Sequence, residues 1–229
     1  MPARAAQRKL ALFDLDHTLI NADTNSLWIA HLGELGLLDS HVHLRHLAGL
    51  DAKYHAGTLG MEDFLSQHLF HLAGQNRNAL AEIRQNFHEA KGRELIGPKA
   101  RAAVKAHQSA GDLCILVTAT CSFVTSTAAL DLGFDHIIGT VAEVSPDGFF
   151  TGKSLGTPSY REGKISRVDD YLRDRGESRS DFSEVWFYSD SRNDLPLLLL
   201  ASHPVAVDPD PSLLQAATER GWPIESFRP

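Results

Sequence analysis

Four carboxylates of this chain stand in two pairs that suit a cation. Asp14 and Asp16 directly follow one short apolar run, and Asp190 and Asp194 follow another. Side chains alternate along a strand, so two carboxylates two residues apart project to the same side. Unpaired carboxylates repel one another, whereas Mg²⁺ takes oxygen ligands and usually keeps several waters. The two pairs therefore predict a magnesium site.

A hydroxyl and an amine accompany these carboxylates. Thr118 ends a third apolar run ahead of a predicted helix, where a hydroxyl and backbone N–H groups can hold a phosphate oxygen. Lys164 begins another predicted helix and offers a point charge for a phosphoryl group. Each residue alone has an ordinary explanation as a strand-end hydroxyl or a surface lysine. Together with the carboxylates, they indicate phosphoryl transfer.

The elements that must position these side chains alternate between strand and helix. This alternation predicts an α/β fold, a Rossmann-like parallel sheet with helices on both faces. Ligands of such sheets bind beyond the carboxyl ends of the strands. We expect strands at 9–13, 113–117, 184–188 and 204–207, and helices at 99–109, 121–132, 163–173 and 195–201.

Residues 21–92 interrupt the alternation. Apolar residues recur there at helical spacing, and no segment has the pattern of a strand. We predict an α-helical cap at 21–92, inserted into a catalytic core of residues 1–20 and 93–229. Within the core, Pro146-Asp147-Gly148 predicts a hairpin of 141–144 with 149–151. The expected cap helices lie at 27–38, 42–50, 61–72 and 80–87.

The composition limits the possible classes of function. The chain has 229 residues, 43% of them hydrophobic and 22% charged, which is typical of a globular protein. A net charge of −7 disfavours binding to nucleic acid. The chain has 2 cysteines, too few for a disulfide framework. With no signal peptide and no long apolar run, we expect a cytoplasmic protein without a membrane partner; the oligomeric state stays open.

In these motifs the chain resembles the haloacid dehalogenase superfamily, specifically its phosphoserine-phosphatase-like branch. The resemblance covers essentially the whole chain, and the predicted insert matches the helical cap of that branch. The usual Gly-Asp-Gly of the family is Ser189-Asp190-Ser191 here, which leaves the carboxylate in place. The four motifs are Asp-x-Asp-x-Thr at 14–18, a strand ending in Thr118, Lys164, and Asp190 with Asp194 four residues on.

The resemblance implies a role for each motif residue. Asp14 would be the nucleophile that forms an aspartyl-phosphate. Asp16 would protonate the leaving alcohol and then activate water. Thr118 and Lys164 would bind the phosphoryl group, and Thr18 would steady the loop.

The resemblance also implies a metal site. Mg²⁺ would be held by Asp14, the backbone carbonyl of Asp16, and Asp190. Asp194 and Asn193 would orient these ligands.

The cap is expected to select the substrate, a small phosphorylated metabolite. Asp23 matches the carboxylate with which phosphoserine phosphatases bind the substrate amino group, although it also fits a helix N-cap. Where those enzymes use an Arg for the substrate carboxylate, this chain has His68, a poor replacement for a guanidinium. An amine-bearing phosphate without a carboxylate fits better, and histidinol phosphate is our specific prediction. Arg161 and Tyr160 face the substrate or only shape the loop before Lys164.

Three alternatives stay open. Phosphoserine remains a candidate substrate, because Arg45, Arg77 or Arg84 would replace the missing Arg if the cap aligns differently. A receiver-like phospho-acceptor module also combines Asp, Thr and Lys at strand ends, but it lacks a cap and has adjacent acids. A non-catalytic binding protein is disfavoured by the intact Asp14 and Asp16. Whether the many cap histidines line the pocket is also open.

Overall fold

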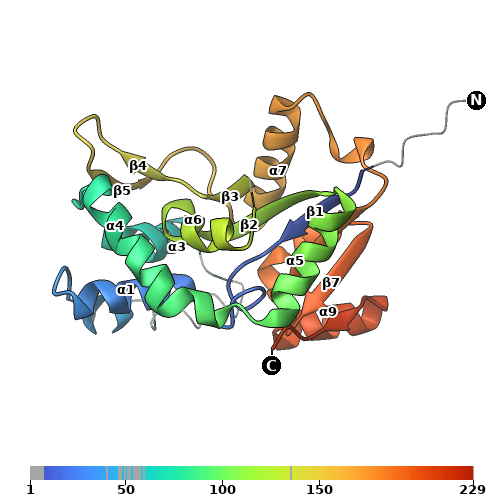
Figure 1. The fold of residues 1–229 in the computed structure, drawn as a ribbon, viewed down its shortest axis with the longest axis horizontal. Helices are drawn as coiled ribbons and strands as arrows, with labels where there is room; N and C mark the ends of the chain where they lie inside the picture. The colour runs from blue at the N-terminus through green and yellow to red at the C-terminus, as the bar shows by residue number, and fades with distance from the viewer. Residues whose placement is uncertain are drawn as a thin grey trace, which may run out of the picture.

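The computed structural model describes residues 8–39, 41–45, 48, 50, 53, 58, 60–134 and 136–228. It confirms the predicted α/β fold: a parallel sheet lies between helices, and a smaller, mainly helical part lies at one end (Figure 1). The six strands are, in spatial order, β3 (His136–Thr140), β2 (Leu113–Cys121), β1 (Leu10–Phe13), β6 (Val185–Ser189), β7 (His203–Val207) and β8 (Ile224–Glu225).

Strand β1 occupies the centre of the sheet. Its four residues are all fully buried, because β2 and β6 flank it in parallel and helices cover both faces. A strand enclosed in this way is continuously apolar, which is the pattern in the sequence. Since parallel strands end at the same edge, β1, β2 and β6 bring Asp14, Thr118 and Asp190 to one rim.

Strand β2 is longer than predicted. It was expected to end at Thr118 but continues to Cys121, and its pairing with β3 shifts register between Val117 and Cys121. The polar residues Thr118 and Thr120 therefore lie within the strand. This irregular stretch passes directly beside the rim.

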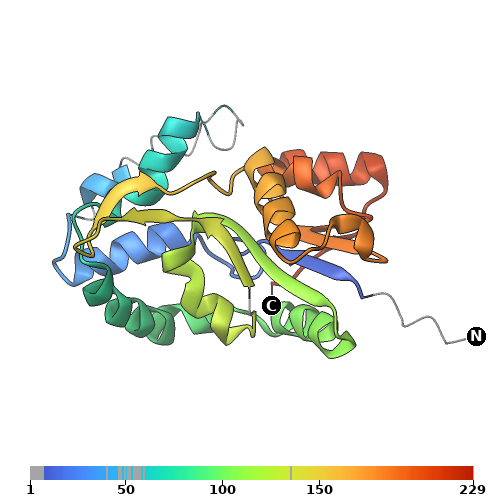
Figure 2. The ribbon, with the colours of Figure 1, turned by 90° about the horizontal axis from the view of Figure 1, so that it is seen from above.

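Helices cover the sheet on both faces (Figure 2). A hydrophobic core lies on each face, and alternate residues of β1 belong to one core or the other. Phe13 packs with residues of α5 and α6, and Leu12 packs with residues of α7, α8 and α9. The helices on the first face are α5 (Pro98–Ala110) and α6 (Ser122–Asp131), and those on the second are α7 (Glu162–Asp174), α8 (Leu195–Leu198) and α9 (Pro211–Arg220).

Most predicted elements of the core are confirmed to within a few residues. The helix expected at 195–201 begins as predicted but ends at Leu198, and a 3-10 turn, η5 (Arg192–Asp194), precedes it. Strands β3 and β8 and helix α9 were not predicted. None of the helices among the described residues is both long and apolar enough to cross a membrane.

The part at the end of the sheet is helical, as predicted for 21–92. Trp28 and Leu72 share a hydrophobic cluster with Val124 of α6, so this part packs on the core. Residues 41–45 are helical, but most of the rest of the helix expected at 42–50 lies outside the described residues. The other elements are α1 (Thr24–Glu34), α3 (Met61–Leu69), η1 (Phe70–Leu72), α4 (Arg77–Phe87), the π-helical turn η2 (His88–Gly92) and η3 (Arg93–Leu95).

The predicted hairpin is formed by β4 (Ala142–Val144) and β5 (Phe150–Ser154). It packs against the cap helices: Gly74 N donates to Phe150 O at 2.9 Å, and Phe150 N donates to Gln75 O at 2.9 Å. The hairpin therefore extends the helical layer, although its sequence position assigned it to the core. The predicted boundaries between core and cap stay predictions.

Candidate active site

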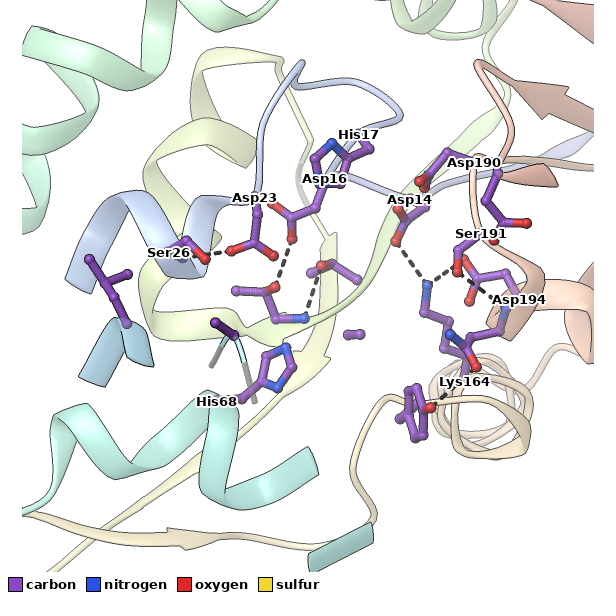
Figure 3. A pocket seen from close by; sticks show the side chains of 18 residues that line it. Asp14, Asp16, His17, Asp23, Ser26, His68, Lys164, Asp190, Ser191 and Asp194 are labelled. Atoms are coloured by element: carbon purple, nitrogen blue, oxygen red, sulfur yellow. Dashed lines mark hydrogen bonds and ion pairs between the residues drawn. The ribbon is translucent and has the colours of Figure 1, made fainter. Parts of the chain in front are cut away.

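A cavity of about 310 Å³ lies where the carboxyl ends of β1, β2 and β6 face the cap (Figure 3). Motif residues from all of these strands reach it, and cap residues close its other end. The lining side chains are Asp14, Asp16, His17, Asp23, Ser26, Leu44, Ala48, His68, Thr118, Ala119, Thr120, Tyr160, Lys164, Asp190, Ser191, Asn193, Asp194 and Asp210.

A tight turn after β1 aims Asp14 and Asp16 at this cavity. Asp14 N donates to Tyr188 O at 2.9 Å and so continues the ladder to β6. The chain then turns around the Leu15 carbonyl oxygen, which accepts from three following N–H groups. His17 takes a positive φ of 59° in this turn. The turn separates the two carboxylates, so that Asp14 points toward Lys164 and Asp16 toward the cap (Figure 3).

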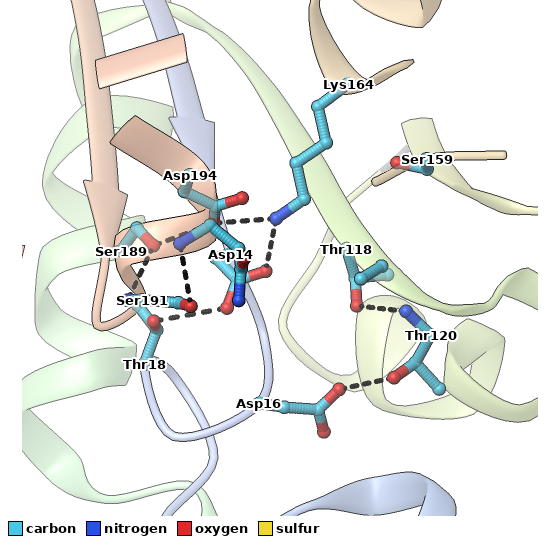
Figure 4. Close-up of polar contacts among 12 residues, drawn as sticks. Asp14, Asp16, Thr18, Thr118, Thr120, Ser159, Lys164, Ser189, Ser191 and Asp194 are labelled. Carbon is cyan, nitrogen blue, oxygen red and sulfur yellow. Dashed lines mark hydrogen bonds and ion pairs between the residues drawn. The ribbon is translucent and has the colours of Figure 1, made fainter. Parts of the chain in front are cut away.

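Lys164 links the two motifs at the sheet end of the cavity (Figure 4). Its Nζ lies 2.8 Å from Asp14 Oδ1 and 2.7 Å from Asp194 Oδ2, and its side chain is only 2% exposed. Ser189 Oγ donates to the same Asp194 oxygen at 2.7 Å. Burial lowers the pKa of Lys164, but the two carboxylates outweigh burial and raise it, so the ammonium is fixed in its charged form.

Thr18 joins Asp14 to Asp190. Its Oγ1 lies 3.3 Å from Asp14 Oδ2 and 3.0 Å from Asp190 Oδ1, and it accepts a hydrogen bond from Asp190 N. Burial, and then the charges of Asp14 and Asp194, raise the pKa of Asp190 well above its usual range. The buried carboxylates of Asp14 and Asp194 and the partly buried carboxylate of Asp190 are thus accompanied by one buried cation, Lys164, and this charge balance favours a further cation.

Asp16 is held by two threonines outside the predicted motifs. Its Oδ1 accepts from Thr24 N at 2.7 Å and from Thr24 Oγ1 at 2.5 Å, and its Oδ2 accepts from Thr120 Oγ1 at 2.7 Å. Burial, and then the charge of Asp23, raise the pKa of Asp16 to about 6. Asp16 is thus close to the protonation state that a general acid needs near neutral pH.

Two polar groups at the sheet end are available to a ligand. Thr118 Oγ1 accepts from Thr120 N at 3.1 Å, and within the described residues its hydroxyl proton has no acceptor. Asn193 Oδ1 accepts from Tyr160 Oη at 3.2 Å and Arg161 Nε at 3.1 Å, whereas its Nδ2 is buried without a partner there. Both groups are donors, as an anionic oxygen requires.

Arg161 is not among the residues that line the cavity, although its neighbour Tyr160 is. Its positive φ of 50° turns the chain into α7, and Gly163 follows because a Cβ there would lie 2.1 Å from Pro158 O. Arg161 therefore reaches the site through Asn193, and its contact with a substrate stays a prediction.

The cap end of the cavity carries Asp23 and His68. Asp23 is the N-cap of α1, where its Oδ1 accepts from Ser26 N at 2.6 Å, and it also lines the cavity. Both expectations for Asp23, an N-cap and a position at the cavity, thus describe its location. Arg77 and Arg84 line a separate cavity beside α6. Among the cap histidines, whose place was left open, the structure brings His68 to the cavity, while His46 and His55 lie outside the described residues.

Sequence reasoning missed several residues that hold the site together. Thr24, Thr120 and Ser189 bond its carboxylates, and Asp210 N donates to Asp190 O at 2.8 Å. Thr120 had a usable signal, since it stands two residues after Thr118 on the same strand. Ser189 directly precedes the motif residue Asp190, whereas the contacts of Thr24 and Asp210 are apparent only in the folded chain.

Comparison with known proteins identifies the family. A family model of haloacid dehalogenase-like hydrolases matches residues 11–199. The chain belongs to this family. This confirms the family predicted from the four motifs, and with it the assignment of the chain as a phosphatase of haloacid dehalogenase type.

Similar proteins cover almost the whole chain. A histidinol-phosphatase of Neisseria meningitidis is 40% identical over 96% of this chain and 100% of its own length. A phosphoserine phosphatase of Mycobacterium tuberculosis, SerB1, is 32% identical over 95% of this chain and 70% of its own. A solved structure from Bordetella pertussis Tohama I is 39% identical, has a TM-score of 0.88, and matches over 97% of this chain and 100% of that one.

Proposed function

We propose that this phosphatase hydrolyses a small phosphate monoester through an aspartyl-phosphate on Asp14, with Mg²⁺ as its cofactor. The observation that carries the proposal is the buried Asp14 carboxylate, which faces the cavity and is bonded to Lys164 at 2.8 Å. Burial raises the pKa of Asp14, and the Lys164 ammonium opposes this by favouring the ionised form that a nucleophile requires. The cytoplasmic location expected from the sequence stays a prediction.

The residues divide the proposed reaction into two steps. Asp14 attacks phosphorus, the phosphorus–oxygen bond to the alcohol breaks, and Asp16 gives its proton to the departing oxygen. Asp16 then takes a proton from water, the water oxygen attacks phosphorus, and the bond to Asp14 breaks. Lys164, the Thr118 hydroxyl and Asn193 Nδ2 would bind the oxygens of the transferring group, which carry the charge.

The donor set fits Mg²⁺, which binds hard oxygen ligands. Asp14 and Asp190 would hold it by their carboxylates and Asp16 by its backbone carbonyl, with Asp194 orienting them. Asp190 supports this assignment, because its partly buried carboxylate lacks a bonded cation among the described residues, and its pKa is raised by loss of solvent and then by its anionic neighbours. When bound, Mg²⁺ would neutralise the phosphoryl oxygens as Asp14 approaches.

Histidinol phosphate is the substrate we propose, as the Neisseria relative is a histidinol-phosphatase. Asp23 would pair with the ammonium of this substrate at the cap end. Lys164, at the sheet end, is the only permanently cationic side chain among the described residues that line the cavity. A substrate carboxylate would therefore meet no counter-ion near the cap.

Phosphoserine is the second candidate, because the SerB1 relative is a phosphoserine phosphatase. The same distribution of charge argues against it. Arg84 donates instead to Phe123 O at 3.0 Å, and the cap positions outside the described residues hold no Lys or Arg. The receiver-like alternative is disfavoured by the cap and by the family match, which spans most of the chain.

Phosphate release from a panel of substrates tests the proposal. We expect Mg²⁺-dependent hydrolysis, lost with EDTA and restored by Mg²⁺, in the order histidinol phosphate, phosphoethanolamine, phosphoserine by kcat/KM. A preference for phosphoserine would overturn the substrate assignment. Full activity in EDTA after metal removal would overturn the assignment of Mg²⁺ as the cofactor.

A further inference from the structure

His68 presents a defined hydrogen-bonding face to the cavity. The ring is buried, 5% exposed, and packs on Phe64 with 4.2 Å between ring centroids. Its Nδ1 lies 3.0 Å from the carbonyl oxygen of Phe64, one helical turn earlier on α3. A carbonyl oxygen only accepts hydrogen bonds, so Nδ1 carries the proton. In the neutral ring, Nε2 is therefore an acceptor.

The surroundings keep this ring neutral. Burial lowers the pKa of His68, and the bond to Phe64 O and the charge of Asp23 oppose burial only in part. At neutral pH, His68 is thus neither a cation nor a donor toward the cavity.

Nε2 of His68 is available as an acceptor at the cavity. Among the described residues, Nε2 of His68 makes no hydrogen bond, and the side chain lines the cavity. Figure 3 shows the ring entering the cavity from the cap, across from Asp16 and Asp23. Asp23 Oδ1 already accepts from Ser26 N, which leaves Oδ2 toward the cavity. The cap end therefore offers a lone pair and a carboxylate to whatever binds.

We infer that His68 Nε2 accepts a hydrogen bond from an N–H group on the organic part of the substrate, and that His68 with Asp23 rejects a carboxylate there. This inference rests on the proposed function and specifies the class of substrate. The accepted monoesters have a cationic or N–H-bearing organic part without an acid. A carboxylate would face an acceptor and a like charge, and it would lose its water without gaining a donor.

The replacement His68→Phe tests this inference, because it keeps a ring against Phe64 and removes the Nε2 acceptor, together with the bond from Nδ1 to Phe64 O within the helix. We expect KM for histidinol phosphate to rise roughly tenfold, the equivalent of one hydrogen bond, with kcat nearly unchanged. The same rise in KM is not expected for phenyl phosphate, which has no N–H group to donate to Nε2. His43→Phe is the matched control, since His43 stacks on Phe70 elsewhere in the cap.

The opposite replacement tests the rejection of acids. His68→Arg supplies the missing cation, so the ratio of kcat/KM for phosphoserine to that for phosphoethanolamine is expected to increase by roughly tenfold or more. An unchanged KM in His68→Phe together with an unchanged ratio in His68→Arg would overturn the inference. The proposed function would then stand, provided that the wild-type enzyme still prefers histidinol phosphate.

The protonated nitrogen can be identified without a replacement of His68. In the ¹⁵N spectrum of the intact protein, we expect His68 to carry its proton on Nδ1. In the non-reactive Asp14→Asn protein, we expect the Nε2 signal of His68 to move when histidinol phosphate is added. A proton on Nε2 would overturn the inference even if both variants failed to fold. Wild-type enzyme that hydrolyses phenyl phosphate but no amine phosphate would instead overturn the proposed substrate.

Discussion

The sheet end and the cap end of the cavity hold their polar side chains by different means. At the sheet end, Lys164 bonds the side chains of Asp14 and Asp194, which lie 150 and 30 positions away in the sequence. At the cap end, Asp23 bonds Ser26 N and His68 bonds Phe64 O, partners three and four positions away on the same helix.

This difference separates the chemistry from the selectivity. A change at the sheet end leaves buried charges unpaired in distant segments, so it should affect folding and every substrate. A change at the cap end removes one contact with the ligand. At most, it also breaks one hydrogen bond within a helix. The cap can therefore vary in specificity while the reaction stays the same.

Asp14→Asn is expected to have the largest effect. Without a carboxylate nucleophile, kcat should fall by more than about 10⁴-fold for all substrates alike, because no aspartyl-phosphate can form. Steady-state phosphate release and mass spectrometry of the acid-quenched enzyme check this. Substantial activity in the variant would remove Asp14 from the role of nucleophile.

Lys164→Met tests the linked charges of the sheet end. It leaves Asp14 and Asp194 buried without their cation, and breaking a buried pair in this way costs ~3–5 kcal/mol of unfolding free energy. The loss should shrink as the pH is lowered, because the two carboxylates become protonated. Urea unfolding at pH 7 and pH 5 measures it, and Lys9→Met, at an exposed ion pair with Glu184, is the control. A loss equal to that of the control would contradict the argument.

Asp16→Asn separates the general acid from the nucleophile. We expect a fall of about 100- to 1,000-fold for alkyl phosphates, whose alkoxide leaving groups need a proton, and a much smaller fall for p-nitrophenyl phosphate. A plot of log kcat against leaving-group pKa should thus steepen in the variant. The same fractional loss for both classes would count against Asp16 as the acid.

How well a strand could be predicted depended on whether its residues form a continuous apolar run. Strand β1 was recognisable because a central parallel strand is buried on both faces and is apolar throughout. Strand β3 was missed because only Ile137 and Ile138 form an apolar pair in it, and β8 because its two residues are exposed at the edge. The continuation of β2 through Thr118 and Thr120 could not be predicted from an apolar run that stops before them.

The site itself was only partly recoverable from sequence. The motif carboxylates and Lys164 were found because their types and order are informative. Thr24 and Thr120 hold Asp16 through contacts across 8 and 104 positions. The position of Thr120 after Thr118 placed it near the site, but neither contact with Asp16 follows from a local pattern. The protonated nitrogen of His68 likewise depends on the position of the Phe64 carbonyl.

Asp23→Asn probes the cap end with little change of shape, since Asn also serves as an N-cap. KM for histidinol phosphate should rise roughly tenfold through loss of the ion pair, whereas KM for phenyl phosphate should not rise. The charge of Asp23 also raises the pKa of Asp16, so this variant should lose activity at a lower pH on the alkaline side. A pH profile of kcat that does not move would show that the two ends are electrostatically independent.

His71→Phe is expected to have the smallest effect and to appear only in acid. His71 is buried in η1 without a hydrogen-bond partner in the described part of the chain, and burial, with His68 and His43, lowers its pKa to about 3. The unfolded chain binds a proton near pH 6.5 that the folded chain excludes, so stability is complete above that pH and declines below it.

Between pH 7 and pH 5.5 the wild type should lose ~1 kcal/mol of unfolding free energy through His71. The variant should lose that much less in urea unfolding, whereas His203→Phe, at a partly exposed ring stacked on Trp186 of the core, should follow the wild type. Equal slopes in wild type and His71→Phe would mean that the cap accommodates the charge, and its histidines would then be as tolerant of protonation as those of the surface.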